Sequence, residues 1–483
     1  MKLSSRMWTS LVAVLLAGHG AVTALELDIN DVRMYICLIW VQAWYDMCRK
    51  LLISGCVAES IKNAAATTAY NMMSNYTGNQ TGQIPGKLPD TWWEGGAMFM
   101  TLIQYWYWTG DTSYNEVTTQ GMLFQKGNDD YFPSNYSNYL GNDDQVFWGL
   151  AAITAAELNY PEQDGQPSWV SLAQGVFNTQ VPRWDTSSCH GGLRWQISTY
   201  QDGYRTKNAI SNGGLFQLAA RLARYTNNET YSQWAERIWD WSATTPLLKE
   251  SDWTIADTTT TETECTDHGD LQWTYNYGTY ISGAAYMYNY TNGSDKWKKG
   301  LDGLLGTTIK RFFPFDNGMV MSEIACEPNM KCDRNQDCFK GFLSSWLTFM
   351  TTIVPYTSSE VVPRIQQSAL AAAKQCSGGT NHTLCGRRWH QDTFDGTSSL
   401  EGQMSALSVF SSSMIAHRMQ TQVPLTADTG GTSKSNASAG TGTEQAASQP
   451  PPVTTGDRAG AGVVTVVFLA GWISAVTWMV YGR

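Results

Sequence analysis

The chain has 483 residues, and its composition excludes several classes of protein. A net charge of -10 argues against nucleic-acid binding, which usually requires a basic surface stripe. Aromatic residues make up 12% of the chain, whereas disordered chains are poor in them. Collagenous and polytopic membrane proteins are excluded too, because there is no Gly-X-Y period and only the two ends are continuously apolar. The length fits one large single-core fold with tails.

Residues 1–24 have the pattern of a secretory signal peptide. Lys2 and Arg6 precede the apolar run Trp8–Ala17, and small residues lead up to Ala24, after which cleavage is expected. Eight N-x-S/T sequons and 10 cysteines suit an oxidising, glycosylating compartment. We therefore expect a secreted glycoprotein with disulfide bonds.

The cysteines favour disulfides over a metal site. Cys326, Cys332 and Cys338 lack histidine partners at zinc-ligand spacing, and the six His do not pair at ligand spacing. Cys376 and Cys385 bracket a loop that a disulfide would close. Neither a phosphate loop nor a nucleophile elbow occurs, so no metal and no other cofactor is expected.

The C-terminal end resembles a GPI-anchor signal. Residues 421–462 form a Ser/Thr/Gly/Pro-rich linker, and residues 463–483 form an apolar tail without a following basic cluster. This combination predicts a GPI anchor attached between Asn436 and Gly456, at the outer face of the plasma membrane. A single membrane-spanning helix is the alternative.

An atypical stretch, residues 32–58, lies within the N-terminal segment 25–59. It holds three cysteines and separates two segments that would otherwise read as continuous. Two interpretations remain open. The stretch is a real amphipathic helix, or it is a gene-model artefact such as a translated intron, since the codon of Val32 begins with the GT of a splice donor.

Residues 60–420 contain about a dozen helical segments by apolar periodicity, and these segments come in pairs. Three pairs share an aromatic-rich joint with a short polar turn, at Trp106–Glu116, Ala223–Trp234 and Tyr288–Lys299. Short turns make paired helices antiparallel neighbours. Their recurrence indicates a repeat architecture.

The first helix of each pair differs in composition from the second. The second helices, such as Glu229–Trp241 and Asp295–Lys310, mix charged and apolar residues and are expected outside. The first helices are apolar on every face and are expected to be buried. They are Trp93–Thr109, Asp143–Asn159, Asn208–Tyr225, Tyr277–Tyr290, Gly341–Ile353 and Gly402–His417. The pattern predicts an all-α fold, an (α/α)6 barrel of six helical hairpins with little β structure.

Aromatic and amide residues gather where the chain enters the buried helices. For any single motif, buried packing aromatics are the simpler explanation. Five such motifs at equivalent positions favour a sugar-binding groove, because aromatic faces stack on sugar C–H faces and amides bond hydroxyls. The candidate substrate-binding residues are Trp92, Trp93, Trp148, Arg194, Trp195, Asn208, Asn212, Tyr275 and Asn276.

Asp143 and Asp144 are the most specific candidates for catalytic residues in the sequence. One Asp at a helix start is an ordinary cap. Two adjacent carboxyls with few positive neighbours raise one another's pKa, so that one ionises while the other keeps its proton. Glycoside hydrolysis needs this division, and the retaining mechanism needs carboxyls about 5–5.5 Å apart.

Several long motifs carry a resemblance to a known family. They lie at Asn71–Pro89, Gly141–Gly149, Trp184–Gln196, Asn212–Thr226, Gly283–Ser294 and Thr426–Lys434. On these motifs the chain resembles fungal glycoside hydrolase family 76, in its GPI-anchored cell-wall branch of mannan endo-1,6-α-mannosidases. The resemblance covers residues 25–31 and 60 to about 438. The stretch 32–58 and Cys338 depart from the family pattern.

The resemblance implies an (α/α)6 barrel and a retaining mechanism on α-1,6-linked mannose, with Asp143 as nucleophile and Asp144 as general acid/base. It implies α-1,6-mannan or the GPI-anchor glycan as substrate. It also implies transfer of GPI-linked proteins into the cell wall, with β-glucan as an acceptor. The alternative is a non-catalytic wall protein that binds mannan or the GPI glycan.

Overall fold

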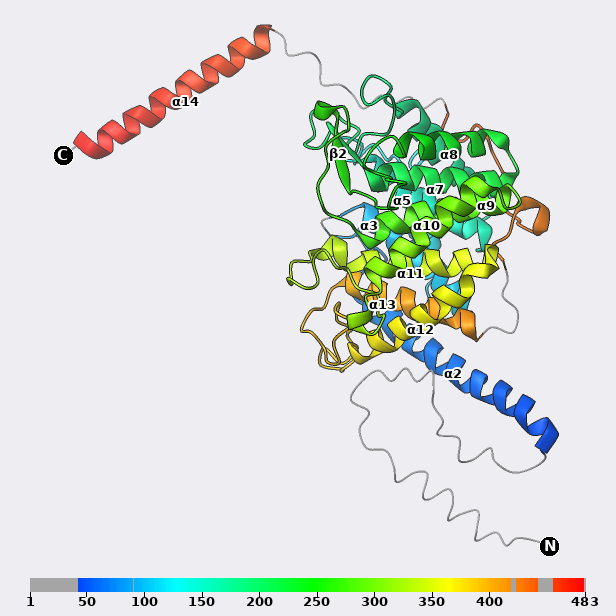
Figure 1. Cartoon of the computed structure of the whole chain (residues 1–483). Coiled ribbons are helices and arrows are strands. Elements are labelled where there is room, and N and C mark those ends of the chain that lie inside the picture. Colours follow the sequence, from blue (N-terminus) through cyan, green and yellow to red (C-terminus); the bar gives the residue numbers. More distant parts are fainter. Residues whose placement is uncertain (1–41, 90, 418–422, 442–454, 482–483) are drawn as a thin grey trace.

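The computed structural model describes residues 42–89, 91–417, 423–441 and 455–481 (Figure 1). The described residues include a closed ring of inner helices, in which each packs against the next and the last returns to the first. These are α3 (Trp93–Thr109), α5 (Asn142–Glu157), α7 (Ala209–Thr226), α9 (Thr274–Tyr290), α11 (Arg334–Ile353) and α13 (Leu400–Ser413). The (α/α)6 barrel is therefore confirmed, and the inner helices are those expected from their apolar composition.

A second layer of helices covers the ring. α4 packs on α3, α6 on α5, α8 on α7 and α10 on α9, while α12 contacts both α11 and α13. Their bounds are Asn115–Phe124 (α4), Trp169–Gln180 (α6), Glu229–Ser242 (α8), Asp295–Phe312 (α10) and Ser358–Lys374 (α12). The outer partner of α13 comes from the other end of the chain, since α2 (Gln42–Met73) packs against it. One of the six expected hairpins is thus discontinuous in sequence.

Strand structure in the described residues is confined to one small antiparallel sheet. β1 (Thr206–Asn208) pairs with β2 (Thr258–Thr260), with Lys207 opposite Thr259. Short 3-10 turns occur at Val181–Arg183, Thr261–Thr263, Phe315–Asn317, Pro355–Thr357, Met414–Ala416 and Ala427–Thr429. The sheet matters because it joins the two loops that enter α7 and α9.

Glycines allow inner helices to approach closely. A Cβ at Gly96 of α3 would come within 2.8 Å of the Trp148 ring on α5, and a Cβ at Gly213 of α7 within 2.5 Å of Thr279 on α9. These contacts leave no room for a side chain. The Gly- and Ala-rich composition of the inner helices therefore sets the spacing of the barrel.

Three disulfides occur among the described residues. They are Cys189–Cys265, Cys326–Cys332 and Cys376–Cys385, of which the last confirms the expected loop closure. Cys338 is a buried free thiol, and Cys56 is an exposed one.

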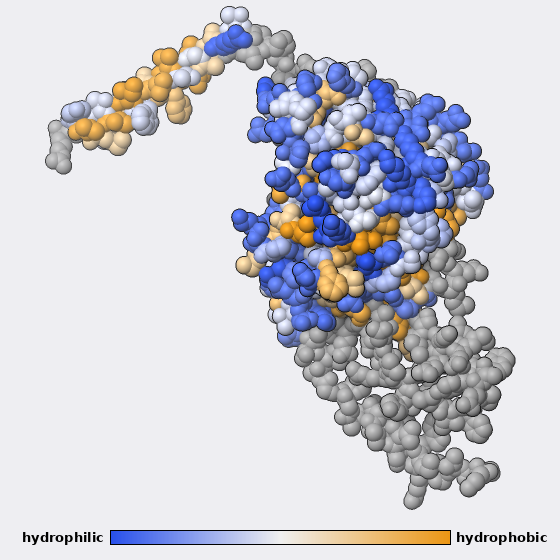
Figure 2. Space-filling view, in the orientation of Figure 1, coloured by the Kyte–Doolittle hydropathy of each residue, from blue (hydrophilic) through white to orange (hydrophobic). Residues whose placement is uncertain are grey.

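Several of the sequence predictions concern the two ends of the chain. The predicted signal peptide, 1–24, and residues 32–41 of the atypical stretch fall outside the described residues. From Gln42 onward the atypical stretch forms the beginning of α2, which extends beyond the barrel (Figure 1). Val57, one residue before the stretch ends, is buried in the core. α14 (Thr455–Tyr481) is exposed and apolar, long enough to cross a membrane, and is compatible with a GPI signal or anchor (Figure 2).

A buried ion pair joins three inner helices. Arg221 of α7 contacts Glu157 of α5 at 2.6 Å, and the Tyr286 hydroxyl of α9 donates to the same carboxylate at 2.9 Å. Removing one partner of a buried pair leaves the other charge uncompensated.

We expect Arg221→Met to lower the free energy of unfolding by about 3–5 kcal/mol, measured by denaturant titration. The matched control is Arg205→Met, because Arg205 makes an exposed pair with Glu262. That control is expected to lose less than about 1 kcal/mol. Equal losses in the two variants would show that the Arg221 pair does not hold the inner ring together.

Candidate active site

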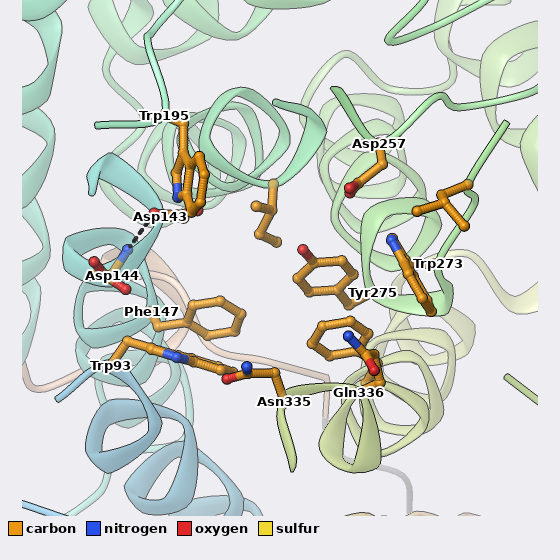
Figure 3. Close-up of a pocket in the computed structure, with 13 residues that line it drawn as sticks. Trp93, Asp143, Asp144, Phe147, Trp195, Asp257, Trp273, Tyr275, Asn335 and Gln336 are labelled. Carbon is orange, nitrogen blue, oxygen red and sulfur yellow. Dashed lines mark hydrogen bonds between the residues drawn. The ribbon is translucent and has the colours of Figure 1, made fainter. Parts of the chain in front are cut away.

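A cleft with a volume of ≈ 410 Å³ opens where several inner helices begin (Figure 3). Its lining includes residues at or beside the starts of α3, α5, α7, α9 and α11. The lining residues are Trp93, Asp143, Asp144, Phe147, Trp195, Ile210, Asp257, Leu271, Trp273, Tyr275, Asn335, Gln336 and Phe339. Among these described residues there are three carboxyls and no Lys, Arg or His. The cleft is therefore aromatic and acidic.

The two adjacent carboxyls occupy the first turn of α5. The Gly141 backbone N–H donates to Asp144 Oδ2 at 2.6 Å, and the Asp144 N–H donates to Asp143 Oδ1 at 3.0 Å. Asn208, which caps α7, donates its amide to Asp143 Oδ2 at 3.0 Å. Because free N–H groups and the positive end of the helix dipole lie here, this position suits acidic side chains. Both carboxyls are held in place while they line the cleft.

Burial controls the protonation of this pair. It raises the pKa of Asp144 to about 6, against a smaller lowering effect of the Gly141 N–H bond. It raises the pKa of Asp143 well above its usual value, and the neighbouring Asp144 charge adds to the rise. Two carboxyls that interact in this way titrate as a unit. The pair therefore keeps one proton at a pH where ordinary aspartates have lost theirs.

Trp195 forms one wall of the cleft beside the carboxyl pair. Its backbone oxygen accepts the Asn142 N–H at 2.9 Å, which fixes the loop to the start of α5. Its ring lies over Gly203, where a Cβ would come within 2.3 Å. Gly203 has φ of 90°, so glycine satisfies both the turn and the contact.

The opposite wall combines aromatic rings with a third carboxyl. The rings of Tyr275 and Phe339 stack at 3.7 Å with an interplanar angle of 4°. Asp257 accepts the Asn276 amide at 2.8 Å, and burial raises the pKa of its carboxyl. Figure 3 shows Asp257 and Tyr275 facing Asp143 across the cleft. A ligand between these walls would contact aromatic faces and carboxyl oxygens together.

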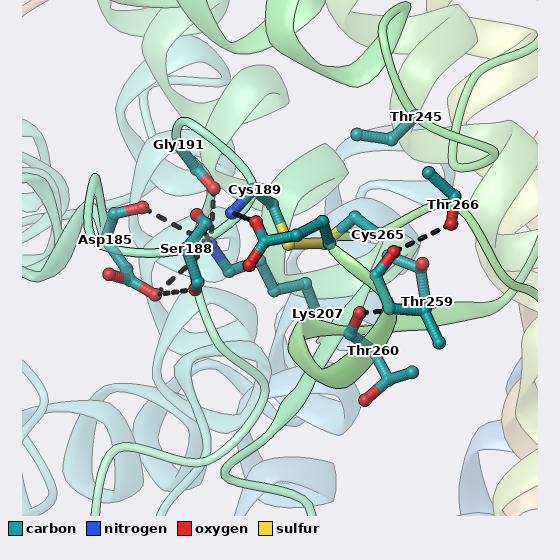
Figure 4. Close-up of a disulfide and its surroundings, with 12 residues drawn as sticks. Asp185, Ser188, Cys189, Gly191, Lys207, Thr245, Thr259, Thr260, Cys265 and Thr266 are labelled. Atoms are coloured by element: carbon teal, nitrogen blue, oxygen red, sulfur yellow. Dashed lines mark hydrogen bonds and ion pairs between the residues drawn. A yellow bond between two sulfur atoms is a disulfide. The ribbon is translucent and has the colours of Figure 1, made fainter.

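A disulfide ties the loops of the two walls together (Figure 4). Cys189 precedes Trp195 in one loop, and Cys265 follows Asp257 in the other. Lys207 lies beneath, fully buried, and donates to the backbone oxygens of Ser188 and Gly191 at 2.8 and 2.5 Å. The loops are thereby anchored to β1 and to each other.

The structure sorts the sequence-predicted binding residues into three groups. Trp93, Trp195 and Tyr275 line the cleft with the carboxyl pair. A second group supports the lining. Asn208 bonds Asp143, and Asn276 bonds Asp257. Arg194 contributes through its backbone oxygen, which accepts the Asn142 amide at 2.9 Å, while its side chain pairs with Asp185 outside the cleft lining.

The third group lies in the interior, away from the cleft lining. Trp148 is fully buried and stacks on Trp92, whose indole N–H donates to Gln125 at 2.8 Å. Asn212 is fully buried and bonds the Leu193 backbone. The two tryptophans pack against each other, and Asn212 fixes a loop to α7, so we propose a structural role for these residues in place of sugar contact.

Sequence reasoning missed several lining residues. Trp273 lies two residues before the predicted Tyr275 and could have been included. Asp257 gave no signal, because it is an isolated acid in a threonine-rich loop. Asn335 and Gln336 were hidden in a charged segment between cysteines and reach the cleft only because α11 begins there. The remaining missed residues are Phe147, Ile210, Leu271 and Phe339.

Comparison with known proteins identifies the family. Residues 60–428 match the model of glycosyl hydrolase family 76. The chain belongs to this family of glycoside hydrolases. It is 40% identical over 428 residues to the mannan endo-1,6-alpha-mannosidase DCW1 of Saccharomyces cerevisiae, covering 88% of this chain and 94% of the relative.

Solved structures agree with this assignment. The crystal structure of Dfg5 from Chaetomium thermophilum, in complex with glucosamine, is 42% identical, with a TM-score of 0.76 over 80% of this chain and 97% of that one. An alpha-1,6-mannanase variant from Salegentibacter, in complex with alpha-1,6-mannotetrose, has a TM-score of 0.58 at 19% identity, covering 73% of this chain and 98% of that one. The second likeness shows the shared barrel fold.

Gly141 is a sensitive position for testing the carboxyl geometry. A Cβ there would come within 2.2 Å of Asp143 Oδ1 and 3.0 Å of the Trp195 backbone oxygen. We expect Gly141→Ala to displace the Asp143 carboxylate and to lower kcat of this glycoside hydrolase about 100-fold. Gly306→Ala on α10 is the control, because a Cβ there meets nothing within 4 Å. Wild-type kcat in Gly141→Ala would contradict the placement of Asp143.

Proposed function

We propose that this family 76 enzyme cleaves α-1,6-linked mannose by a retaining mechanism, with Asp143 as nucleophile and Asp144 as general acid/base. The observation that carries the proposal is the pair of adjacent carboxyls, fixed by backbone N–H groups and both lining one aromatic cleft. The named activity of the DCW1 relative supports the substrate class.

The first step would form a bond between a carboxylate oxygen of Asp143 and the anomeric carbon of the mannose. The bond from that carbon to the leaving oxygen breaks, and the Asp144 proton passes to the leaving oxygen. In the second step an acceptor hydroxyl gives its proton to Asp144 and attacks the anomeric carbon, which releases Asp143. Water as acceptor gives hydrolysis, and a sugar hydroxyl gives transfer.

The proton must lie on Asp144 when the bond breaks. In the free enzyme the larger rise in pKa falls on Asp143, because Asp143 feels both burial and the Asp144 charge. As positive charge develops at the anomeric carbon, it favours the ionised form of the facing carboxyl. Substrate would thus move the shared proton to Asp144, as the proposed roles require.

We expect a bell-shaped pH profile of kcat/KM. Activity needs one proton on the pair, so it is lost on the acid side when both carboxyls are protonated and on the alkaline side when both are ionised. The acid limb should lie near the Asp144 pKa of about 6. The measurement uses an α-1,6-mannooligosaccharide, with Asp143→Asn and Asp144→Asn as variants that should each lose turnover.

The control for that profile is Asp240→Asn, since Asp240 is an exposed residue of α8 that pairs with Lys296. It should keep the wild-type profile. A flat profile between mildly acidic and neutral pH, or wild-type turnover in both variants of the pair, would contradict the mechanism.

We further propose that the natural glycan is that of a GPI anchor, transferred to a cell-wall β-glucan by a protein that is itself GPI-anchored at the outer face of the plasma membrane. Two observations support this choice. The Dfg5 relative binds glucosamine, and the cleft holds three carboxyls without a facing cation among its described lining. An unacetylated amino sugar, which GPI glycans contain, carries the positive charge that such a cleft favours.

Asp257 is the carboxyl assigned to bind that amine, because Asp143 and Asp144 are assigned to nucleophilic attack and proton transfer. We expect wild-type protein to bind glucosamine about 10-fold more tightly than N-acetylglucosamine at neutral pH, where Asp257 is ionised, a difference of about 1.4 kcal/mol. Asp257→Asn should remove the preference, and Asp240→Asn should keep it. Calorimetric titration measures all three. Equal binding of the two sugars by wild type would contradict amine recognition.

A further inference from the structure

Arg183 does not line the cleft, but it lies next to the helix turn that carries the carboxyl pair, in the lining of a separate pocket that it shares with Asn142. It ends the short turn that follows α6, and its guanidinium lies over the Phe132 ring at 4.7 Å. Among the described residues Arg183 makes no ion pair, although the charge of Asp130 acts to raise its pKa. Burial lowers its pKa to about 10, so it remains a cation at neutral pH. A half-buried cation without a salt bridge gains stability from strong hydrogen bonds.

Those hydrogen bonds go to the two residues that flank the carboxyl pair. Arg183 Nη1 donates to Asn142 Oδ1 at 3.1 Å and to Gln145 Oε1 at 2.6 Å. Asn142 immediately precedes Asp143, and Gln145 immediately follows Asp144. A single nitrogen therefore holds both ends of the four-residue segment that carries the carboxyls.

Other hydrogen bonds orient the side-chain amides of Asn142 and Gln145 so that their oxygens face Arg183. The Gln145 amide N–H group is directed to Thr179 Oγ1 and the Asp130 backbone oxygen, both at 2.8 Å, so its oxygen is turned to the guanidinium. The Asn142 amide N–H group donates to the Arg194 backbone oxygen at 2.9 Å, which orients it in the same way. Both oxygens are thus presented to Arg183 by independent contacts.

We propose that Arg183 is a positioning residue for the reaction, which acts through Asn142 and Gln145 to fix the first turn of α5 so that Asp143 and Asp144 face the cleft. The charge of the guanidinium strengthens both bonds, because charge-assisted hydrogen bonds are about twice as strong as neutral ones. A small displacement of a reacting group lowers the rate of the reaction strongly. The hydrogen bonds of Arg183 would therefore act on kcat by holding the two carboxyls in place. The proposal rests on the catalytic role of the carboxyl pair.

The test compares substitutions at Arg183 in the full-length secreted protein. Arg183→Met keeps the length of the side chain and removes the donors. We expect kcat on an α-1,6-mannooligosaccharide to fall about 100-fold while KM changes less than about 3-fold, because the cleft walls are untouched. Arg183→Lys, which keeps one charged donor, should restore part of kcat. Arg237→Met on α8 is the control, since Arg237 stacks on Trp184 and Trp234. No hydrogen bond or ion pair joins Arg237 to α5 among the described residues.

A second readout does not depend on the acceptor. The rate of covalent labelling of Asp143 by an α-manno-configured cyclitol epoxide, followed by intact mass, should fall in Arg183→Met in parallel with kcat. Gln145→Leu should show a similar loss, and the double variant should lose little more than the worse single variant, because residues that act through one contact are not additive.

Several outcomes separate this proposal from its alternatives. Wild-type labelling and kcat in Arg183→Met would overturn it. Loss of thermal stability with unchanged kcat would assign Arg183 a structural role only, and fully additive losses with Gln145→Leu would show that it does not act through that residue. Failure of Asp143→Asn to abolish labelling would instead refute the proposed nucleophile, which keeps the two failures distinguishable.

Discussion

The first turn of α5 carries the constraint on which the site depends. Two carboxyl side chains must stand next to each other in a cleft that provides no facing cation from its described lining. The turn stabilises them with backbone N–H donors and with the Asn208 amide, which are partners that cannot themselves transfer a proton at working pH. Burial then decides the protonation, so that the pair holds one proton where two separate aspartates would hold none. A salt bridge to either carboxyl would remove this property.

The barrel serves this arrangement by bringing helix starts from distant parts of the chain to one end. Aromatic walls come from the loops that enter the helices, and the Cys189–Cys265 disulfide keeps the two longest of these loops in register with each other. Glycines at close contacts let the rings of Trp148 and Trp195 lie flat against backbone. Rigid packing behind the cleft and crosslinked loops around it are both needed to hold a ligand between two walls.

Much of this organisation could be predicted from the sequence. Apolar residues on every face of six helices predicted an inner ring, because a helix with that composition is buried. Asp143 and Asp144 stood out because adjacent acids with few cationic neighbours are unusual at a helix start. The residues that contact the cleft were harder to assign. Trp148 and Trp195 have the same side chain and similar motif contexts, yet one lies inside a helix–helix contact and the other on a loop.

Asp257 and Arg183 show the limit of sequence patterns more sharply. Each lies in an unremarkable loop or turn, and each gains its place only from long-range packing, Asp257 opposite the pair and Arg183 behind it. No local periodicity encodes such contacts. They follow from the closure of the helical ring, which places segments more than 100 residues apart around one cleft.

The central claim is that Asp143 attacks the anomeric carbon while Asp144 handles the proton. Trapping with a 2-deoxy-2-fluoro α-mannosyl donor, followed by peptide mass mapping, tests it directly. The account predicts one added fluoromannosyl group on Asp143, absent in Asp143→Asn and slow to be released in Asp144→Asn. A label on Asp144 or Asp257, or turnover with inversion at the anomeric carbon, would contradict it.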